Sequence, residues 1–138
     1  MRESLFTQRF AAKAENLKQL REWVRDITLA HGVSEQRTEK AIIGVNEACM
    51  NIIEHAYKHS AGDIVLDISK DQDSIIYELT DFAQPMDCAK IKSRKLEDIR
   101  PGGLGVYFIQ EVMDEVEYIP GTAGTGNRIC MRINNIKA

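Results

Sequence analysis

The chain has 138 residues, of which 43% are hydrophobic and 28% are charged, and its formal net charge is −3. A chain of this length forms one domain and buries about two-thirds of its unfolded surface, so its core needs no disulfide or structural metal. The small acidic excess argues against direct nucleic-acid binding, which usually depends on a basic surface. We therefore expect a single globular domain, residues 1–138.

The N-terminal sequence and the cysteines also favour an intracellular globular protein. Met1–Phe10 has no apolar core of a secretion signal, and no apolar run approaches the ~20 residues of a membrane span. Cys49, Cys88 and Cys130 are odd in number, widely spaced and without a CxxC pair. We expect unpaired thiols in a reducing compartment, and a cytoplasmic protein that does not engage a membrane.

The N-terminal third predicts a strand and a helix. Ser4–Phe10 is a short segment with aromatic residues that favours a first strand. Ala14–Ala30 has the helical period, with apolar residues on one face at Leu17, Leu20, Val24 and Ile27. His31-Gly32 supplies a glycine just past the helix, where helices commonly stop.

Ser34 is a candidate N-cap for a second helix that extends to about His59. Its predicted apolar face consists of Ile42, Val45, Cys49, Ile52, Ile53 and Ala56. Two alternating segments follow, Asp63–Ser69 and Ile75–Thr80, and only a short polar stretch separates them. This spacing predicts a β-hairpin.

The segment Ala83–Pro101 has no clean period, and its cations are Lys90, Lys92, Arg94, Lys95 and Arg100. A loop of this length in a compact domain often serves as a functional lid, so we expect a partly helical, mobile lid at about 83–101. Gly102–Gly105 opens a third predicted helix that ends near Met113. Val116–Ile119 and Arg128–Ile133 then predict a second hairpin across the glycine-rich turn Pro120–Asn127.

The predicted order is β-α-α-β-β-lid-α-β-β. Consecutive hairpins require antiparallel pairing, and three helices are too few to cover both faces of such a sheet. We expect an α+β fold: a two-layer α/β sandwich with a mixed, mostly antiparallel sheet and helices on one face.

The second helix carries a polar stripe made of Glu47, Asn51, Glu54 and Lys58, opposite its apolar face. A solvated helix face is one interpretation of the stripe. Ile43 and Asn51 favour another, because a solvated face would prefer charged residues and Asn is a poor helix former. Amide and carboxylate oxygens on one face suit Mg²⁺ bound together with substrate phosphates.

Two other features carry candidate chemistry. Asp81 ends a predicted strand, where a carboxylate can accept a hydrogen bond from a ligand or simply serve a turn. Gly102-Gly103-Leu104-Gly105 precedes an apolar helix, where free N–H groups and the helix dipole favour an anion. Glycines also simply start and stop elements. The glycines at 121, 124 and 126 suit a flexible turn.

The sequence lacks the motifs of several enzyme classes. His55 and His59 have a possible metal spacing, but no HExxH motif accompanies them. The serines show no nucleophile-elbow context, and neither a Walker nor a Rossmann glycine motif is present.

The order and type of these residues resemble a known family. The stretch Glu47-Ala48-x-x-Asn51-Ile52-x-Glu54-His55-Ala56-Tyr57 is similar to the helix motif of the GHKL ATPase superfamily (gyrase, Hsp-ninety, histidine kinase and MutL type). Its form is nearest to that of the bacterial anti-sigma-factor serine/threonine kinases. Asp81, the turn Gly102–Gly105 and Gly126-Asn127-Arg128 resemble the further motifs of that family in the same order, so the resemblance spans about residues 5–135.

The resemblance implies the Bergerat ATP-binding fold, ATP and Mg²⁺ as cofactors, and a role for each matching residue. Asn51 would hold Mg²⁺, Glu47 would be the catalytic base, and Asp81 would receive the adenine amino group. Asn127 would take the place of a threonine near the adenine, and Arg100 would contact the γ-phosphate. The phosphates would be wrapped by the lid-side residues Gly102, Gly103, Leu104 and Gly105.

The resemblance also implies a function: an anti-sigma factor and protein serine/threonine kinase that phosphorylates an antagonist protein of the STAS type. A sigma factor and this antagonist would be its partners, and the chain would form a homodimer through its first strand and helix.

One departure leaves an alternative open. Ala83 stands where the family has Gly, and its methyl group would crowd the adenine or exclude a positive φ. A nucleotide-sensing or inactive module that only holds a protein partner is therefore the second interpretation, and a plain ATPase is a third.

Overall fold

The computed structural model describes residues 2–83, 109–121 and 126–137. In this part of the chain the strands form one sheet in the order β1-β2-β3-β5-β4, and every pair is antiparallel. The strands are β1 (Arg2–Ala11), β2 (Asp63–Asp71), β3 (Ser74–Asp81), β4 (Glu115–Ile119) and β5 (Asn127–Ile133). The predicted hairpins β2–β3 and β4–β5 are both confirmed.

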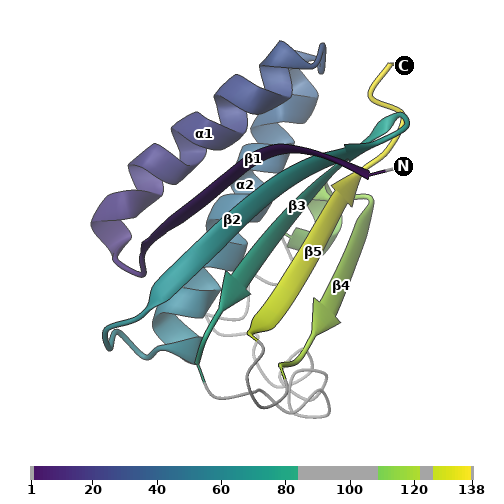
Figure 1. The fold of residues 1–138 in the computed structure, drawn as a ribbon. Coiled ribbons are helices and arrows are strands. Elements are labelled where there is room, and N and C mark those ends of the chain that lie inside the picture. Colours follow the sequence, from purple (N-terminus) through teal and green to yellow (C-terminus); the bar gives the residue numbers. More distant parts are fainter. Residues whose placement is uncertain (1, 84–108, 122–125, 138) are drawn as a thin grey trace.

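The helices lie on one face of this sheet (Figure 1). They are the short 3₁₀ turn η1 (Ala14–Asn16), α1 (Leu17–Ala30), α2 (Glu35–Asn51) and the π-helical turn η2 (Ile52–Ala56). The predicted two-layer α+β sandwich is therefore confirmed, with a sheet that is wholly antiparallel among the described strands. The core between the layers includes the fully buried Leu20, Val24, Val45, Cys49, Ile64, Leu66, Ile68, Tyr77 and Leu79.

Helix α2 starts as predicted but ends differently. The Ser34 hydroxyl accepts a hydrogen bond from the Arg37 amide at 3.2 Å, which caps the helix. The predicted end near His59 is wrong, because the chain widens into η2 and the residues at 58 and 59 then adopt left-handed backbone angles, with φ of 51° and 63°. Lys58 therefore leaves the polar stripe that a continuous helix would have given it.

The first strand is longer than predicted and is held to α1 by aromatic rings. Phe6 and Phe10 lie 5.6 and 5.7 Å from the ring centroid of Trp23. The register of β1 against β2 shifts between Ser4 and Phe6, so a bulge interrupts the pairing there. Within the described sheet β1 is an edge strand.

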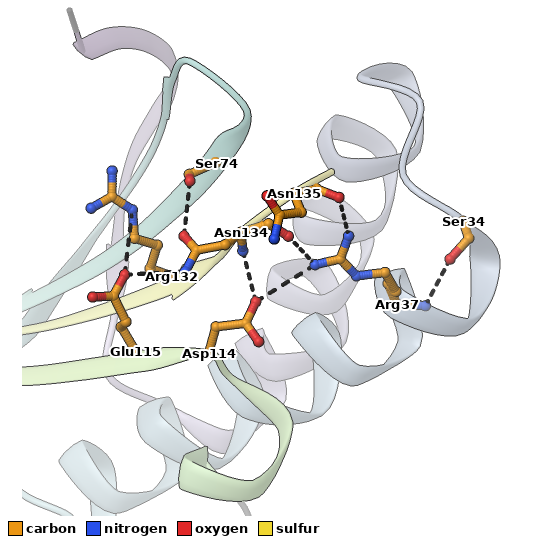
Figure 2. A network of polar contacts seen from close by, with 8 residues as sticks. All are labelled: Ser34, Arg37, Ser74, Asp114, Glu115, Arg132, Asn134 and Asn135. Carbon is orange, nitrogen blue, oxygen red and sulfur yellow. Dashed lines mark hydrogen bonds and ion pairs between the residues drawn. The ribbon is translucent and has the colours of Figure 1, made fainter. Parts of the chain in front are cut away.

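Arg37 joins the start of α2 to the C-terminal segment, at the end of the molecule shown in Figure 2. Its guanidinium donates to the carbonyls of Asn135, at 2.8 Å, and Asn134, and it lies 3.6 Å from the Asp114 carboxylate. Asp114 in turn accepts a hydrogen bond from the Asn134 amide at 2.7 Å. The Ser74 hydroxyl adds a bond to the Asn134 side chain at 2.8 Å. Three segments far apart in the sequence thus meet at one guanidinium.

Residues 109–112 are helical and pack on α2 at Gly44. A Cβ on Gly44 would lie 2.6 Å from Met113 Cε and 3.1 Å from Val112 Cγ2, so glycine permits this close packing. The remainder of the predicted third helix, the predicted lid beyond Ala83 and the turn Gly102–Gly105 lie outside the described residues. Among the helices that the structure describes, none combines the length and the apolar character needed to cross a membrane.

Candidate functional site

The candidate site is centred on a buried pair of polar side chains at the end of the sheet. Asp81 is the last residue of β3 and Asn127 the first of β5, and the strand register places them directly opposite each other. Each is only 2% exposed. The Asn127 side-chain amide donates to Asp81 Oδ1 at 2.9 Å, and the Ala83 amide donates to the same oxygen at 3.0 Å. Two sequence-predicted site residues, 46 positions apart, are thus in direct contact.

Asn127 uses both ends of its amide to hold the surrounding backbone. Its nitrogen also donates to the Ala83 carbonyl at 3.1 Å, while its oxygen accepts from the Gly121 amide at 2.8 Å. A side chain with both a donor and an acceptor is needed for this, which asparagine supplies. Asn127 therefore fixes the path of the chain on both sides of the pair.

The Asp81 carboxylate keeps one oxygen for another donor. Among the described residues, both hydrogen bonds to this carboxylate go to Oδ1. Burial raises the pKa of Asp81, and the bonds from Asn127 and the Ala83 amide oppose that rise. A buried carboxylate with a remaining acceptor oxygen suits a ligand that presents an N–H donor.

Gly126 permits the close approach of the two strands at this point. A Cβ there would lie 2.5 Å from the Asp81 carbonyl oxygen and 2.6 Å from Thr80 Cγ2. Backbone cannot yield as a flexible side chain does, so a larger residue would displace the start of β5. The glycine expected to make a turn flexible serves instead to bring Asn127 against Asp81.

Ala83 fits its position without backbone strain. It is half-buried, and it is not among the described non-glycine residues with positive φ. Its amide and carbonyl both take part in the hydrogen bonds around Asp81 and Asn127. The alanine therefore does not prevent the loop from adopting the backbone conformation that holds the pair.

Without Lys58, the polar stripe consists of Glu47 and Asn51 of α2 and Glu54 of η2. All three residues are partly buried. Ile43, one turn before Glu47, is 44% exposed. Glu54 pairs with the adjacent His55 at 3.8 Å. Figure 1 shows the C-terminal end of α2 at the same end of the molecule as the end of β3 and the start of β5.

Tyr57 is the last residue of the helix motif Glu47–Tyr57, and the sequence predicts no role for it. It follows η2, is 8% exposed, and its hydroxyl contacts the backbone at the start of β2 and just after the end of β3. An amphipathic tyrosine at the end of a helix is a modest signal, since a buried phenol needs a polar partner. Which partners it finds depends on the tertiary structure.

The other predicted site residues, Arg100, Gly102, Gly103, Leu104 and Gly105, lie outside the described residues. In the part of the chain that the structure describes, no group of three or more His, Cys, Asp or Glu side chains could hold a metal ion. Magnesium in nucleotide sites commonly takes few protein ligands and completes its shell with phosphates and water. The oxygen donors of α2 fit that requirement, and Asp81 fits a purine with an exocyclic amino group.

The model of the histidine kinase-like ATPase domain matches residues 10–133. The chain belongs to this family, and the resemblance seen in the sequence is confirmed.

The curated relatives with similar sequences include serine-protein kinases named RsbW. A serine-protein kinase RsbW from Bacillus cereus strain G9842 is 28% identical over 114 residues, which are 77% of this chain and 71% of that protein. An RsbW from Bacillus mycoides is 27% identical over the same share.

Two solved structures share the fold. One contains the RsbU and RsbW domains of a Mycobacterium tuberculosis protein, with a TM-score of 0.65 and 14% identity. It matches 94% of this chain and 32% of that longer one. The other is the SiaB–SiaC complex of Pseudomonas aeruginosa, with a TM-score of 0.64 and 14% identity over 94% of this chain and 88% of that one.

Proposed function

We propose that this protein is an ATP-dependent serine/threonine kinase and anti-sigma factor that acts in the cytoplasm within a partner-switching system. It phosphorylates an antagonist protein of the STAS type, and it holds a sigma factor when the antagonist does not compete. The proposal rests on family membership, on relatives named serine-protein kinase, and on a structural neighbour solved in complex with another protein. The observation that carries its chemistry is the buried Asp81–Asn127 pair.

Nucleotide selection begins with Asp81. The adenine amino group donates to the carboxylate oxygen that Asn127 and Ala83 leave available among the described residues. Asn127 keeps this carboxylate in place, and its own amide lies beside the base. A guanine, which carries a carbonyl oxygen at that position, would place an acceptor against the carboxylate and bind less tightly.

Phosphoryl transfer requires positioning more than covalent chemistry. Asn51 would hold Mg²⁺, and the ion would supply positive charge beside the phosphates. Glu47, one helical turn earlier on the same face, accepts the proton of the attacking serine or threonine hydroxyl. Gly102, Gly103, Leu104 and Gly105 wrap the phosphates, and Arg100 of the lid at about 83–101 contacts the γ-phosphate.

The decisive experiment measures binding and transfer separately. Calorimetric titration of Mg-ATP into the protein should give micromolar binding that Asn51→Ala abolishes. Asn46→Ala is the matched control on the same helix, because its side chain accepts from Arg21 at 3.0 Å and has no role in the proposed site. Tight binding by Asn51→Ala would refute its role as magnesium ligand.

Transfer of labelled phosphate to a candidate STAS-type antagonist should be lost in Glu47→Ala while ATP binding is kept. Glu39→Ala, an exposed α2 glutamate paired with Arg25, should transfer normally. Equal transfer by Glu47→Ala would remove the assigned base. No nucleotide binding by the unaltered protein would instead favour a module that only holds a partner, and phosphate release without an acceptor would favour a plain ATPase.

We further propose a homodimer in which β1 and α1 form the contact. Within the described sheet β1 pairs only with β2, so its other edge offers backbone groups over Arg2–Ala11. Analytical ultracentrifugation should give twice the monomer mass. A Thr7→Pro substitution, which removes a donor from this strand, should weaken the dimer, and a monomer at all concentrations would contradict this assignment.

A further inference from the structure

The turn that follows Asn51 is wider than an α-helical turn. The Tyr57 amide donates to the Ile52 carbonyl at 2.9 Å, five residues back, rather than to the carbonyl four residues back. Such π-helical turns are rare and occur mainly at functional sites, where they redirect a side chain. Tyr57 follows this turn directly, and its hydroxyl reaches the backbone of the sheet side of the fold.

The Tyr57 hydroxyl bridges the start of β2 and the residue after β3, at the edge of the candidate site. It donates to the Asp63 carbonyl at 2.6 Å, at the start of β2, and accepts from the Phe82 amide at 2.8 Å. Burial raises the pKa of Tyr57, so the hydroxyl keeps the proton that the first of these bonds needs. Phe82 is the residue immediately after Asp81.

The ring of Tyr57 is held as firmly as its hydroxyl. A Cβ on Gly62 would lie 2.2 Å from Tyr57 Cε1, so this position admits only a residue without a side chain. The ring is thus packed against the backbone that enters β2.

The segment Asp81–Ala83 is therefore held from two sides. Asn127 of β5 holds the Ala83 carbonyl at 3.1 Å, and Tyr57 holds the Phe82 amide at 2.8 Å. The first contact belongs to the sheet, whereas the second comes from the helix that carries Asn51. The peptide that orients the Asp81 carboxylate thus has one anchor on each layer of the fold.

From these contacts we infer that Tyr57 is a positioning residue for base recognition: its hydroxyl fixes the backbone after Asp81 and couples the phosphate-binding helix to the adenine-binding carboxylate. This inference rests on the proposed ATP-binding function. Without the hydroxyl, the Phe82 amide loses its acceptor and the loop relaxes. The adenine amino group then loses part of its hydrogen bond to Asp81, whereas contacts to the phosphates are kept.

The test compares ATP with inosine triphosphate, which has no exocyclic amino group, in the full-length protein with Mg²⁺. The unaltered protein should bind ATP more tightly than inosine triphosphate. Tyr57→Phe should lower the ratio of these two affinities about fivefold, because ATP binding weakens while inosine triphosphate binding stays the same. Gly62→Ala should narrow it too, because it displaces the ring while the hydroxyl remains. Fluorescence competition gives all these affinities.

Tyr77→Phe is the matched control. Tyr77 is fully buried, and its hydroxyl bonds the Thr28 hydroxyl at 2.6 Å in the core, away from Asp81. Its removal should lower the stability to urea as Tyr57→Phe does, but leave the ratio of affinities unchanged. An unchanged ratio in both Tyr57→Phe and Gly62→Ala would overturn the inference while leaving ATP binding intact. Failure of the unaltered protein to bind ATP would instead refute the proposed function, and the inference with it.

Discussion

At the scale of single residues, the buried carboxylate of Asp81 illustrates how a binding residue costs stability. Its pKa is raised, chiefly by burial, so the folded state holds the proton more firmly than the unfolded chain does. The contribution of Asp81 to the free energy of unfolding is then greatest below the ordinary pKa of 3.8 and is lost as the pH rises through the raised pKa of the folded state. The ionised Asp81 carboxylate, which would accept the ligand's hydrogen bond at neutral pH, therefore lowers the stability of the protein without ligand.

The substitution Asp81→Asn separates these two effects. Its amide oxygen can still accept from Asn127 and the Ala83 amide, whereas the opposite atom becomes a donor facing the adenine amino group. We expect unfolding free energy at pH 7 equal to or above that of the unaltered protein, with ATP affinity lower by about 10- to 100-fold. Urea unfolding between pH 3 and 7 should show the gain growing with pH, and a large loss of stability would contradict this account.

The cysteines show burial acting on a different group. The pKa of Cys49 is raised to about 12 by burial, and that of Cys130 to about 12 by burial and by the adjacent Glu78 carboxylate. Thiols of this kind are protonated and unreactive at physiological pH. Both are free, as the sequence predicted for these two residues.

At the scale of elements, the sheet positions the site through one close contact between strands. The Asp81–Asn127 register depends on Gly126, where a Cβ would meet the Asp81 carbonyl at 2.5 Å. The approach of β5 to β3 is thus set by a missing side chain as much as by hydrogen bonds.

Gly126→Ala should lower the free energy of unfolding by about 1–3 kcal/mol, because the overpacked methyl group moves the start of β5. ATP affinity should fall as well, since Asn127 moves with the strand. Urea unfolding and calorimetry measure both. Adding Thr80→Ser removes the methyl contact at 2.6 Å but not the carbonyl, so it should restore little; full recovery would show that the side chain alone was the obstacle.

The opposite end of the molecule depends on Arg37 (Figure 2). Its side chain is 29% exposed and its guanidinium contacts two backbone carbonyls and Asp114, so its loss removes a donor from each of these acceptors. Arg37→Gln should lower the free energy of unfolding by about 1–2 kcal/mol and release the C-terminal segment. Urea unfolding and hydrogen exchange of the Asn134 and Ile136 amides report the two effects.

Arg25→Gln is the control for this prediction. Arg25 pairs with Glu39 at 2.6 Å, but both side chains are about half exposed, at 47% and 53%. Exposed ion pairs are screened by water, so this change should cost less than about 0.5 kcal/mol. Equal losses in the two variants would show that the Arg37 network adds nothing beyond a surface charge.

At the scale of the whole molecule, ligand binding should couple to folding because the proposed site is built from both layers. Mg-ATP at about 100 times its dissociation constant should add about 2.7 kcal/mol, which raises the melting temperature by roughly 5–10 °C. Differential scanning fluorimetry checks this. Asn51→Ala should abolish the shift and Asn46→Ala should keep it; a shift of the same size without Mg²⁺ would argue against a metal-assisted site.

Much of the architecture follows from the sequence, because local periods and caps are local physics. The alternation around Ile64–Ile68 and Ile75–Leu79 predicted β2 and β3, and Ser34 predicted the start of α2. Asp81 and Asn127 were also identified as candidates, and both lie in the buried pair. Their roles with a nucleotide remain predictions, as do those of the candidates between Arg100 and Gly105.

The sequence by itself thus predicted the order of the described elements, the two-layer class and the family, since each depends on patterns within a few turns of chain. Only the tertiary structure decided that β3 lies beside β5, which brings Asp81 to Asn127 across 46 positions. It also decided that α2 widens after Asn51 and sends Tyr57 to the Phe82 amide. These contacts depend on strand register and close packing, in which the absence of a side chain at Gly62 or Gly126 matters as much as the side chains that meet there.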